Sequence, residues 1–129
     1  MVIDTSAILA ILFGEPERGD FAEAIASAPT RLVGSVTALE AAVVVASRKG
    51  PAGSRELDLL FHQAGIDIVA FSEDHLRIAR KAYEAFGKGR HPASLNLGDC
   101  CSYALAKLSG EPLLFKGDDF SRTDIPSVL

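Results

Sequence analysis

Short segments of strand character alternate with longer segments of helical periodicity along the whole chain. The expected strands are residues 1–3, 31–35, 66–69, 112–115 and a short final one at 125–129. The expected helices are residues 6–13, 17–28, 38–49, 56–64, 73–86 and 98–108. Strands that alternate with helices in this way pair in parallel, and the helices cover both faces of the sheet. We therefore predict an α/β fold with a central parallel sheet.

The length and composition favour one domain, residues 1–129, without an appended module. The chain has 129 residues, and no internal repeat, low-complexity tract or linker interrupts it. Hydrophobic residues make up 48% and charged residues 23%, which excludes intrinsic disorder. The net charge of −4 argues against a general polyanion-binding protein, because Lys and Arg drive phosphate contact. Any role in binding nucleic acid must therefore be local.

The apolar runs argue against a membrane protein, and the spacing of Cys and His argues against a zinc site. Each apolar run is short and broken by Gly, Pro or charge, so we expect a soluble, cytoplasmic protein. Cys100 and Cys101 are adjacent and have no second pair, so we expect reduced thiols with at least one in the core. His62, His75 and His91 are dispersed and have no partner at ligand spacing. Nothing in this pattern favours a zinc site.

Four acidic positions have apolar or small neighbours, so a solvated surface does not explain their charge. They are Asp4 after the first strand, Glu40 in an apolar helix, Asp99 at a helix start, and Asp118 with Asp119 after strand 112–115. Glu40 has the weakest structural explanation. An ionised carboxylate among Ala, Leu and Val carries a desolvation cost of several kcal/mol unless a partner or a metal compensates it.

Structural roles remain open for the other acids. Asp4 or Thr5 could cap the helix that follows, and Asp99 could stabilise a helix N-terminus through the macrodipole. Asp118 or Asp119 could belong to a turn beside Gly117. Hydroxyls also suit helix starts, and Ser35 or Thr37 is expected to cap helix 38–49.

Three of these acids lie where strands reach loops or helices begin, which in a parallel sheet tends to be one edge. Carboxylates brought together there would repel one another and raise each other's pKa unless a divalent cation neutralised them. Hard oxygen ligands without His or Cys favour Mg²⁺ or Mn²⁺. Such a site is suited to metal-assisted phosphodiester hydrolysis.

Four motifs carry a family resemblance that covers the whole chain. They are the opening Asp4-Thr5-Ser6-Ala7, the helix of Glu40, the sequence LNLGDCCSYALA at residues 95–106, and the sequence LLFKGDDFSRTDI at residues 113–125. In this order and spacing they resemble PIN-domain ribonucleases, and most closely the VapC toxins of bacterial type II toxin–antitoxin systems. The resemblance implies a three-layer α/β/α sandwich, endoribonuclease activity with Mg²⁺ or Mn²⁺, a homodimer, and inhibition by a cognate VapB antitoxin.

The resemblance also implies site residues. Asp4, Glu40 and Asp99 match the first three acids of the family's catalytic and metal-binding set. Both Asp118 and Asp119 are candidates for the fourth, and we favour Asp118 because it comes first after the glycine turn. Ser6 either helps to hold the substrate or a metal-bound water, or caps a helix.

The loop at residues 87–92 is the only clearly basic and glycine-rich part of the chain. Lys88 and Arg90 could grip an RNA backbone, or the loop could simply be solvated. Tyr83 and Phe86 lie on one helical stripe and are expected in the core or at a dimer interface.

Three rival functions fit less well. A phospho-signalling receiver domain needs an acceptor Asp after its third strand, where this chain has Val69-Ala70-Phe71-Ser72. A haloacid-dehalogenase-like phosphatase would place a second Asp at the position of Ser6. A non-catalytic RNA-binding or regulatory module of the same fold stays open, and metal-dependent cleavage would distinguish it.

Overall fold

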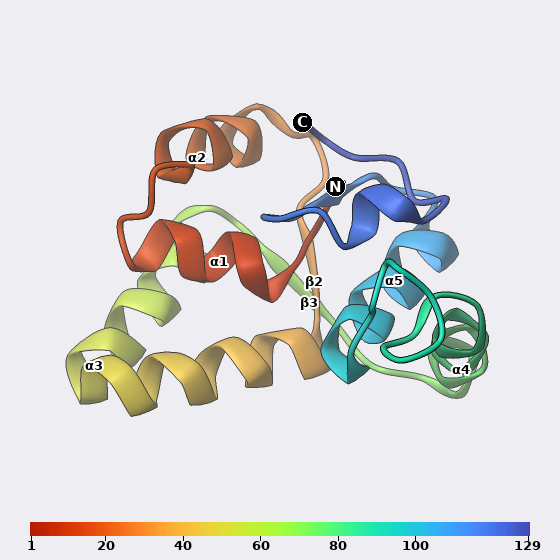
Figure 1. Cartoon of the computed structure of the whole chain (residues 1–129). Helices are drawn as coiled ribbons and strands as arrows, with labels where there is room; N and C mark the ends of the chain where they lie inside the picture. Colours follow the sequence, from red (N-terminus) through yellow and green to blue (C-terminus); the bar gives the residue numbers. More distant parts are fainter.

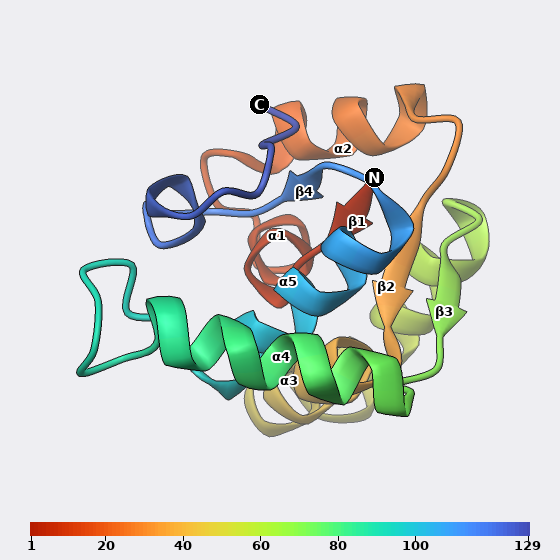
Figure 2. The same cartoon turned by 90° about the vertical axis from the view of Figure 1, so that its right-hand side faces the viewer.

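The computed structural model describes residues 1–129 and contains one four-stranded parallel sheet. Its strands are β1 (Val2–Ile3), β2 (Leu32–Gly34), β3 (Asp67–Val69) and β4 (Leu113–Leu114), in the order β3-β2-β1-β4. Val2 of the central strand pairs with Leu32 on one side and Leu113 on the other. The predicted parallel sheet is confirmed (Figure 2).

Helices cover both faces of this sheet (Figure 1). They are α1 (Thr5–Leu12), α2 (Arg18–Ser27), α3 (Ser35–Gln63), α4 (Glu73–Phe86) and α5 (Leu97–Ser109), followed by the short 3₁₀ helix η1 (Phe120–Arg122). One core cluster joins the sheet to α1, α2 and α3, and a second joins it to α4 and α5. None of these helices combines the length and the apolar composition that crossing a membrane requires.

Neighbouring residues of one strand belong to different cores. Val2 and Leu113 pack with α4 and α5, whereas Ile3 and Leu114 pack with α1, α2 and α3. This follows from the geometry of a strand, in which successive side chains point to opposite faces. Each of these four side chains is at most 1% exposed, so both faces of the sheet are fully covered and the three-layer α/β/α architecture is confirmed.

The helix predictions at residues 38–49 and 56–64 correspond to one element, the 29-residue α3. Its helical path is broken at Gly50, where φ is 61° and ψ is −155°, and Pro51 opens the next helical turn (Figure 1). Proline suits the first turn because its missing N–H would have no partner there. Gly50 and Pro51 therefore turn α3 sharply without an intervening loop.

Two further predictions need correction. The expected strand at residues 125–129 forms only an isolated bridge between Ser127 and Leu113. Neither Ser35 nor Thr37 caps α3, because the helix begins at Ser35 with Gly34 as its N-cap residue. The hydroxyl of Ser35 instead accepts a hydrogen bond from the backbone N–H of Phe71 at 3.1 Å.

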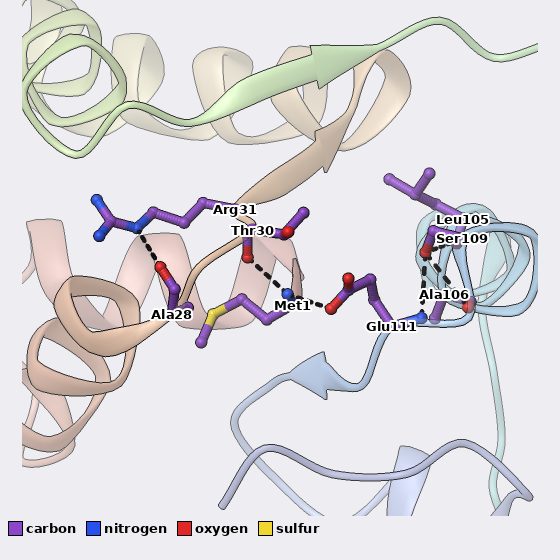
Figure 3. Close-up of polar contacts among 8 residues, drawn as sticks. All are labelled: Met1, Ala28, Thr30, Arg31, Leu105, Ala106, Ser109 and Glu111. Atoms are coloured by element: carbon purple, nitrogen blue, oxygen red, sulfur yellow. Dashed lines mark hydrogen bonds and ion pairs between the residues drawn. The ribbon is translucent and has the colours of Figure 1, made fainter.

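Polar contacts fix the N-terminal ends of β1 and β2, away from the acids that follow the strands (Figure 3). The Met1 amine donates to the Thr30 carbonyl at 2.6 Å and to Oε2 of Glu111 at 2.7 Å. Arg31 donates to the carbonyls of Ala26, Ala28 and Ala64. It thereby satisfies carbonyls at the C-terminal ends of α2 and α3 that have no partner within their own helix.

Candidate acidic site at the strand ends

Asp4 follows β1 directly, where it caps α1 and also lies among the acids. Its backbone N–H donates to the Leu114 carbonyl at 2.9 Å, which extends the pairing of β1 with β4. Its Oδ2 accepts from the backbone N–H of Ser6 at 3.1 Å and from the Ser6 hydroxyl at 2.7 Å, so Asp4 caps α1. Its Oδ1 accepts from the Ser102 hydroxyl at 2.6 Å. The residue is only 4% exposed, which makes it a buried acid held from two sides.

Ser6 connects this acid to the end of β4. Its hydroxyl donates to Asp4 and accepts from the backbone N–H of Lys116 at 3.0 Å. The capping of α1 comes from the Asp4 side chain, so Ser6 itself orients the carboxylate.

The second acid, Glu40, lies on α3 and contacts the first turn of α1. The Thr5 hydroxyl donates to its Oε1, so the residue after Asp4 holds the second acid. The carboxylate also packs against Gly98 at the start of α5, where a Cβ atom would lie 2.6 Å from Oε2. Glu40 therefore lies between the first turns of α1 and α5.

Asp99 lies in the first turn of α5, and its position also combines a structural role with a place among the acids. Its backbone N–H donates to Oδ1 of Asn96 at 2.9 Å, and its Oδ2 accepts from the Asn96 N–H at 3.0 Å. This is a capping box. Burial raises the pKa of Asp99 to about 6, the hydrogen bond from Asn96 opposes this shift, and the charges of Asp4, Asp119 and Glu40 add to it. The charges of three other acids therefore act on Asp99, although burial is the largest cause of its raised pKa.

The two candidates for the fourth acid lie in the turn after β4. Gly117 has a φ of 97°, and Asp118 and Asp119 lead from it into η1. Asp119 is among the residues whose charge raises the pKa of Asp99, and Asp118 is not. The backbone carbonyl of Asp118 accepts from the Ser121 hydroxyl at 2.5 Å, a contact internal to the turn. Of the two candidates, Asp119 is thus the one with an electrostatic effect on Asp99.

No basic side chain compensates these carboxylates. The seven ion pairs of the structure use other acids: Glu15, Glu17, Glu56, Glu73, Asp74, Glu111 and Asp124. The groups that donate to these carboxylates are hydroxyls and backbone N–H groups. No three His, Cys, Asp or Glu side chains form a preformed cage for a metal ion. The site is therefore a cluster of oxygen donors with uncompensated negative charge.

Arg90 and Lys88 of the basic loop at residues 87–92 differ in their surroundings. Arg90 lies with its guanidinium 5.5 Å from the centre of the Tyr83 ring, and it lines a cavity of about 600 Å³ together with Leu97, Cys100 and Cys101. These residues flank Asp99 in the sequence. The Lys88 side chain makes no ion pair and does not line this cavity. Of the two basic residues of the loop, only Arg90 lines this cavity.

Both cysteines are buried and free, which confirms the prediction of reduced core thiols. Burial raises the pKa of Cys100 to about 11, and the nearby charge of Asp99 adds to the shift. The thiol therefore stays protonated at neutral pH and is a poor nucleophile. Packing in the core of α4 and α5 accounts for it.

Three residues around the acids were not predicted to lie at the site. They are Thr37, Gly98 and Ser102. Ser102 follows Asp99 by one helical turn and Thr37 precedes Glu40 by one turn, so the same helix faces carry both kinds of residue. That spacing could have identified the two hydroxyls once the acids were chosen.

The chain is similar to known proteins over almost its whole length. The family model described as PIN domain matches residues 1–126. Ribonuclease VapC30 of Mycobacterium tuberculosis is 52% identical over 128 residues, with 99% of this chain and 98% of the relative covered. Ribonuclease VapC of Mycolicibacterium smegmatis is also 52% identical, with 99% of each chain covered.

Two solved structures share the fold at low sequence identity. VapC20 of Mycobacterium tuberculosis, described as a sarcin-ricin loop cleaving toxin, has a TM-score of 0.77 and 16% identity, and the match covers 96% of this chain and 95% of that one. VapBC2 of Rickettsia felis, bound to a DNA fragment from its promoter, has a TM-score of 0.77 and 14% identity, with 98% and 94% covered.

Proposed function

Because this chain belongs to the PIN domain family and, within it, to the VapC ribonucleases, we propose that it is a divalent-metal-dependent endoribonuclease and the toxin of a type II toxin–antitoxin system. The observation that carries this proposal is the group of carboxylates around Asp99 that no basic residue compensates. Relatives named as ribonucleases support RNA as the substrate.

The donor set fits a hard cation. Asp4, Glu40, Asp99 and Asp119 offer only carboxylate oxygens, which suits Mg²⁺ or Mn²⁺ and not zinc. A divalent ion would also offset the charges of Asp4, Asp119 and Glu40, which add to the effect of burial on the pKa of Asp99. When bound, such an ion activates a water and offsets charge on the phosphodiester.

The chain's own residues have distinct tasks in this scheme. Ser6 and Asn96 hold the carboxylates of Asp4 and Asp99 at the ends of α1 and α5. Arg90, which lines the cavity beside the first turn of α5, is proposed to contact an RNA phosphate, and Lys88 is proposed as a second phosphate contact from the same loop. Substrate contact therefore comes from a few local cations in an acidic protein.

Cleavage of total RNA by the purified protein tests the enzymatic proposal. We expect cutting with Mg²⁺ or Mn²⁺, none with EDTA, and nearly none for Asp4→Asn or Asp99→Asn. Circular dichroism would check that both variants are folded. Cutting that EDTA and both substitutions leave unchanged would refute the metal mechanism, and no cutting under any condition would favour a non-catalytic RNA-binding module.

The proposed partner is a cognate VapB antitoxin. Support comes from the solved neighbours, which include a toxin–antitoxin complex from Klebsiella pneumoniae with a TM-score of 0.74. We expect the protein to act in the cytoplasm, so its expression alone should arrest bacterial growth. Co-expression of the adjacent small open reading frame should relieve the arrest. Growth without arrest at any expression level would contradict the toxin role.

A homodimer is the other proposed assembly. Large apolar side chains are exposed on three neighbouring helices: Leu39 at 64%, Val43 at 60%, Leu76 at 46% and Leu97 at 77%. Such exposed apolar surface favours contact with another chain. Analytical ultracentrifugation should find a dimer, and Val43→Asp should shift it to the monomer. A monomeric wild type at all concentrations would contradict this assembly.

A further inference from the structure

Two buried hydroxyls form a chain that ends on Asp4. Thr37 and Ser102 are each 1% exposed, and their Oγ atoms are 3.2 Å apart. The Ser102 hydroxyl also lies 2.6 Å from Oδ1 of Asp4 and donates to it. A hydroxyl has one proton, so Ser102 cannot also donate to Thr37. Thr37 therefore donates to Ser102, and Ser102 donates to Asp4.

This chain joins the three elements that carry the acids. Thr37 lies on α3 one turn before Glu40, and Ser102 lies on α5 one turn after Asp99. Asp4 connects β1 to α1. The hydroxyls thus meet behind the acidic site, on the side away from solvent.

The hydrogen bonds at Asp4 restrict its carboxylate to one orientation. Oδ2 accepts from the N–H and the hydroxyl of Ser6, and Oδ1 accepts from Ser102. A carboxylate has about four lone-pair positions, so about one stays free. Without Ser102, Oδ1 would have no protein donor, and the carboxylate could rotate about the contacts with Ser6.

We propose that Ser102 is a positioning residue that fixes the Asp4 carboxylate for a divalent cation, and that Thr37 acts only through Ser102. The inference rests on the proposed metal-dependent function. Groups that orient a metal ligand typically change the metal affinity by about 10-fold to 100-fold when they are removed. Ser102 should therefore affect cation affinity without contacting RNA.

Calorimetric titration of the purified protein with Mn²⁺, without RNA, tests this role. We expect Ser102→Ala to weaken the affinity by about 10-fold and Thr37→Val by a smaller factor. The double variant should match Ser102→Ala, because Thr37 has no separate path to Asp4. Ser109→Ala is the matched control: it removes a hydroxyl from the same helix that contacts only the Leu105 and Ala106 carbonyls and the Glu111 N–H.

Cleavage kinetics give a second measurement. For Ser102→Ala, saturating Mn²⁺ should restore much of kcat while KM for RNA stays unchanged, and Ser109→Ala should match the wild type throughout. Equal Mn²⁺ affinity in the wild type and Ser102→Ala would overturn the positioning role and leave the metal mechanism intact. Absence of Mn²⁺ binding in the wild type would instead refute both. If Ser102→Ala does not fold, Thr37→Val decides, since it keeps the side-chain shape, and unchanged affinity would again overturn the proposal.

Discussion

The Glu40 carboxylate occupies the space that a side chain at position 98 would need. A Cβ atom on Gly98 would lie 2.6 Å from Oε2 and 2.8 Å from Oε1 of Glu40. Gly98 belongs to the first turn of α5 and does not have a positive φ, so close approach and not backbone conformation explains the glycine. The absent side chain allows α5, with Asp99, to pack directly against the acid of α3.

Gly98→Ala should therefore damage the site more than the fold. The added methyl group must displace the Glu40 carboxylate, and we expect the affinity for Mn²⁺ and the rate of RNA cleavage each to fall by at least about 10-fold. Alanine favours helix, so the thermal midpoint should change little. Gly19→Ala in α2 is the control, because its Cβ would meet no atom within 4 Å. Unchanged Mn²⁺ affinity in Gly98→Ala would contradict the close packing of Gly98 on Glu40.

Acids that stand out from their neighbours along the chain could be identified from the sequence alone. Asp4 and Glu40 stand out because apolar neighbours within a few residues leave their charge unexplained, and both lie in the site. The structural alternatives proved compatible with this role, since Asp4 caps α1 and Asp99 completes a capping box. A helix start at a strand end requires a cap and also points into the crevice, so one carboxylate serves both purposes.

The remaining features depend on packing between distant segments. The choice between Asp118 and Asp119 depends on how the turn after Gly117 approaches α5. The role of Thr37 depends on α5 lying beside α3, which no local pattern reveals. The predicted helix 38–49 ends at the observed break, but the sharp turn without a loop follows from the backbone geometry of Gly50 and Pro51.

Asp99→Asn should stabilise the metal-free protein. The pKa of Asp99 is about 6 when folded, against 3.8 ordinarily, so between these values the folded chain holds a proton that the unfolded chain has released. The stabilisation that this proton gives the folded chain is thus fully present below the unfolded pKa and is lost as the pH rises through about 6. Asp99 is partly exposed, and with solvent screening the loss is about 1 kcal/mol.

Urea denaturation in EDTA, over a pH series, measures this effect. Above about pH 7 the variant should be more stable than the wild type by about 1 kcal/mol, and the difference should shrink toward about pH 4. Asparagine keeps the oxygen that accepts from Asn96, so the capping box survives. Added Mn²⁺ should raise the stability of the wild type and not of the variant. A variant less stable than the wild type at every pH would show that Asp99 is not electrostatically strained.

Asp119→Asn and Asp118→Asn separate the two candidates for the fourth acid. Of the two, Asp119 is the one whose charge adds to the raised pKa of Asp99, so Asp119→Asn should weaken Mn²⁺ binding and lower the cleavage rate by about 10-fold. Asp118→Asn should change both quantities by less than about twofold. The same titration and cleavage measurements apply to both variants, which are identical in chemistry and adjacent in sequence. A larger effect of Asp118→Asn would return the fourth position to that residue.

Arg90→Gln should weaken RNA binding more than Lys88→Gln. Arg90 lines the cavity beside α5, whereas the Lys88 side chain does not reach it. Loss of a phosphate contact lowers the dependence of RNA affinity on salt, and the slope of log K against log salt should fall by about 0.7 for a single strand. Filter binding with the Asp99→Asn protein in EDTA measures affinity without cleavage. If adding Arg90→Gln to the Asp99→Asn protein left the salt slope unchanged, Arg90 would make no RNA contact and the loop would simply be solvated.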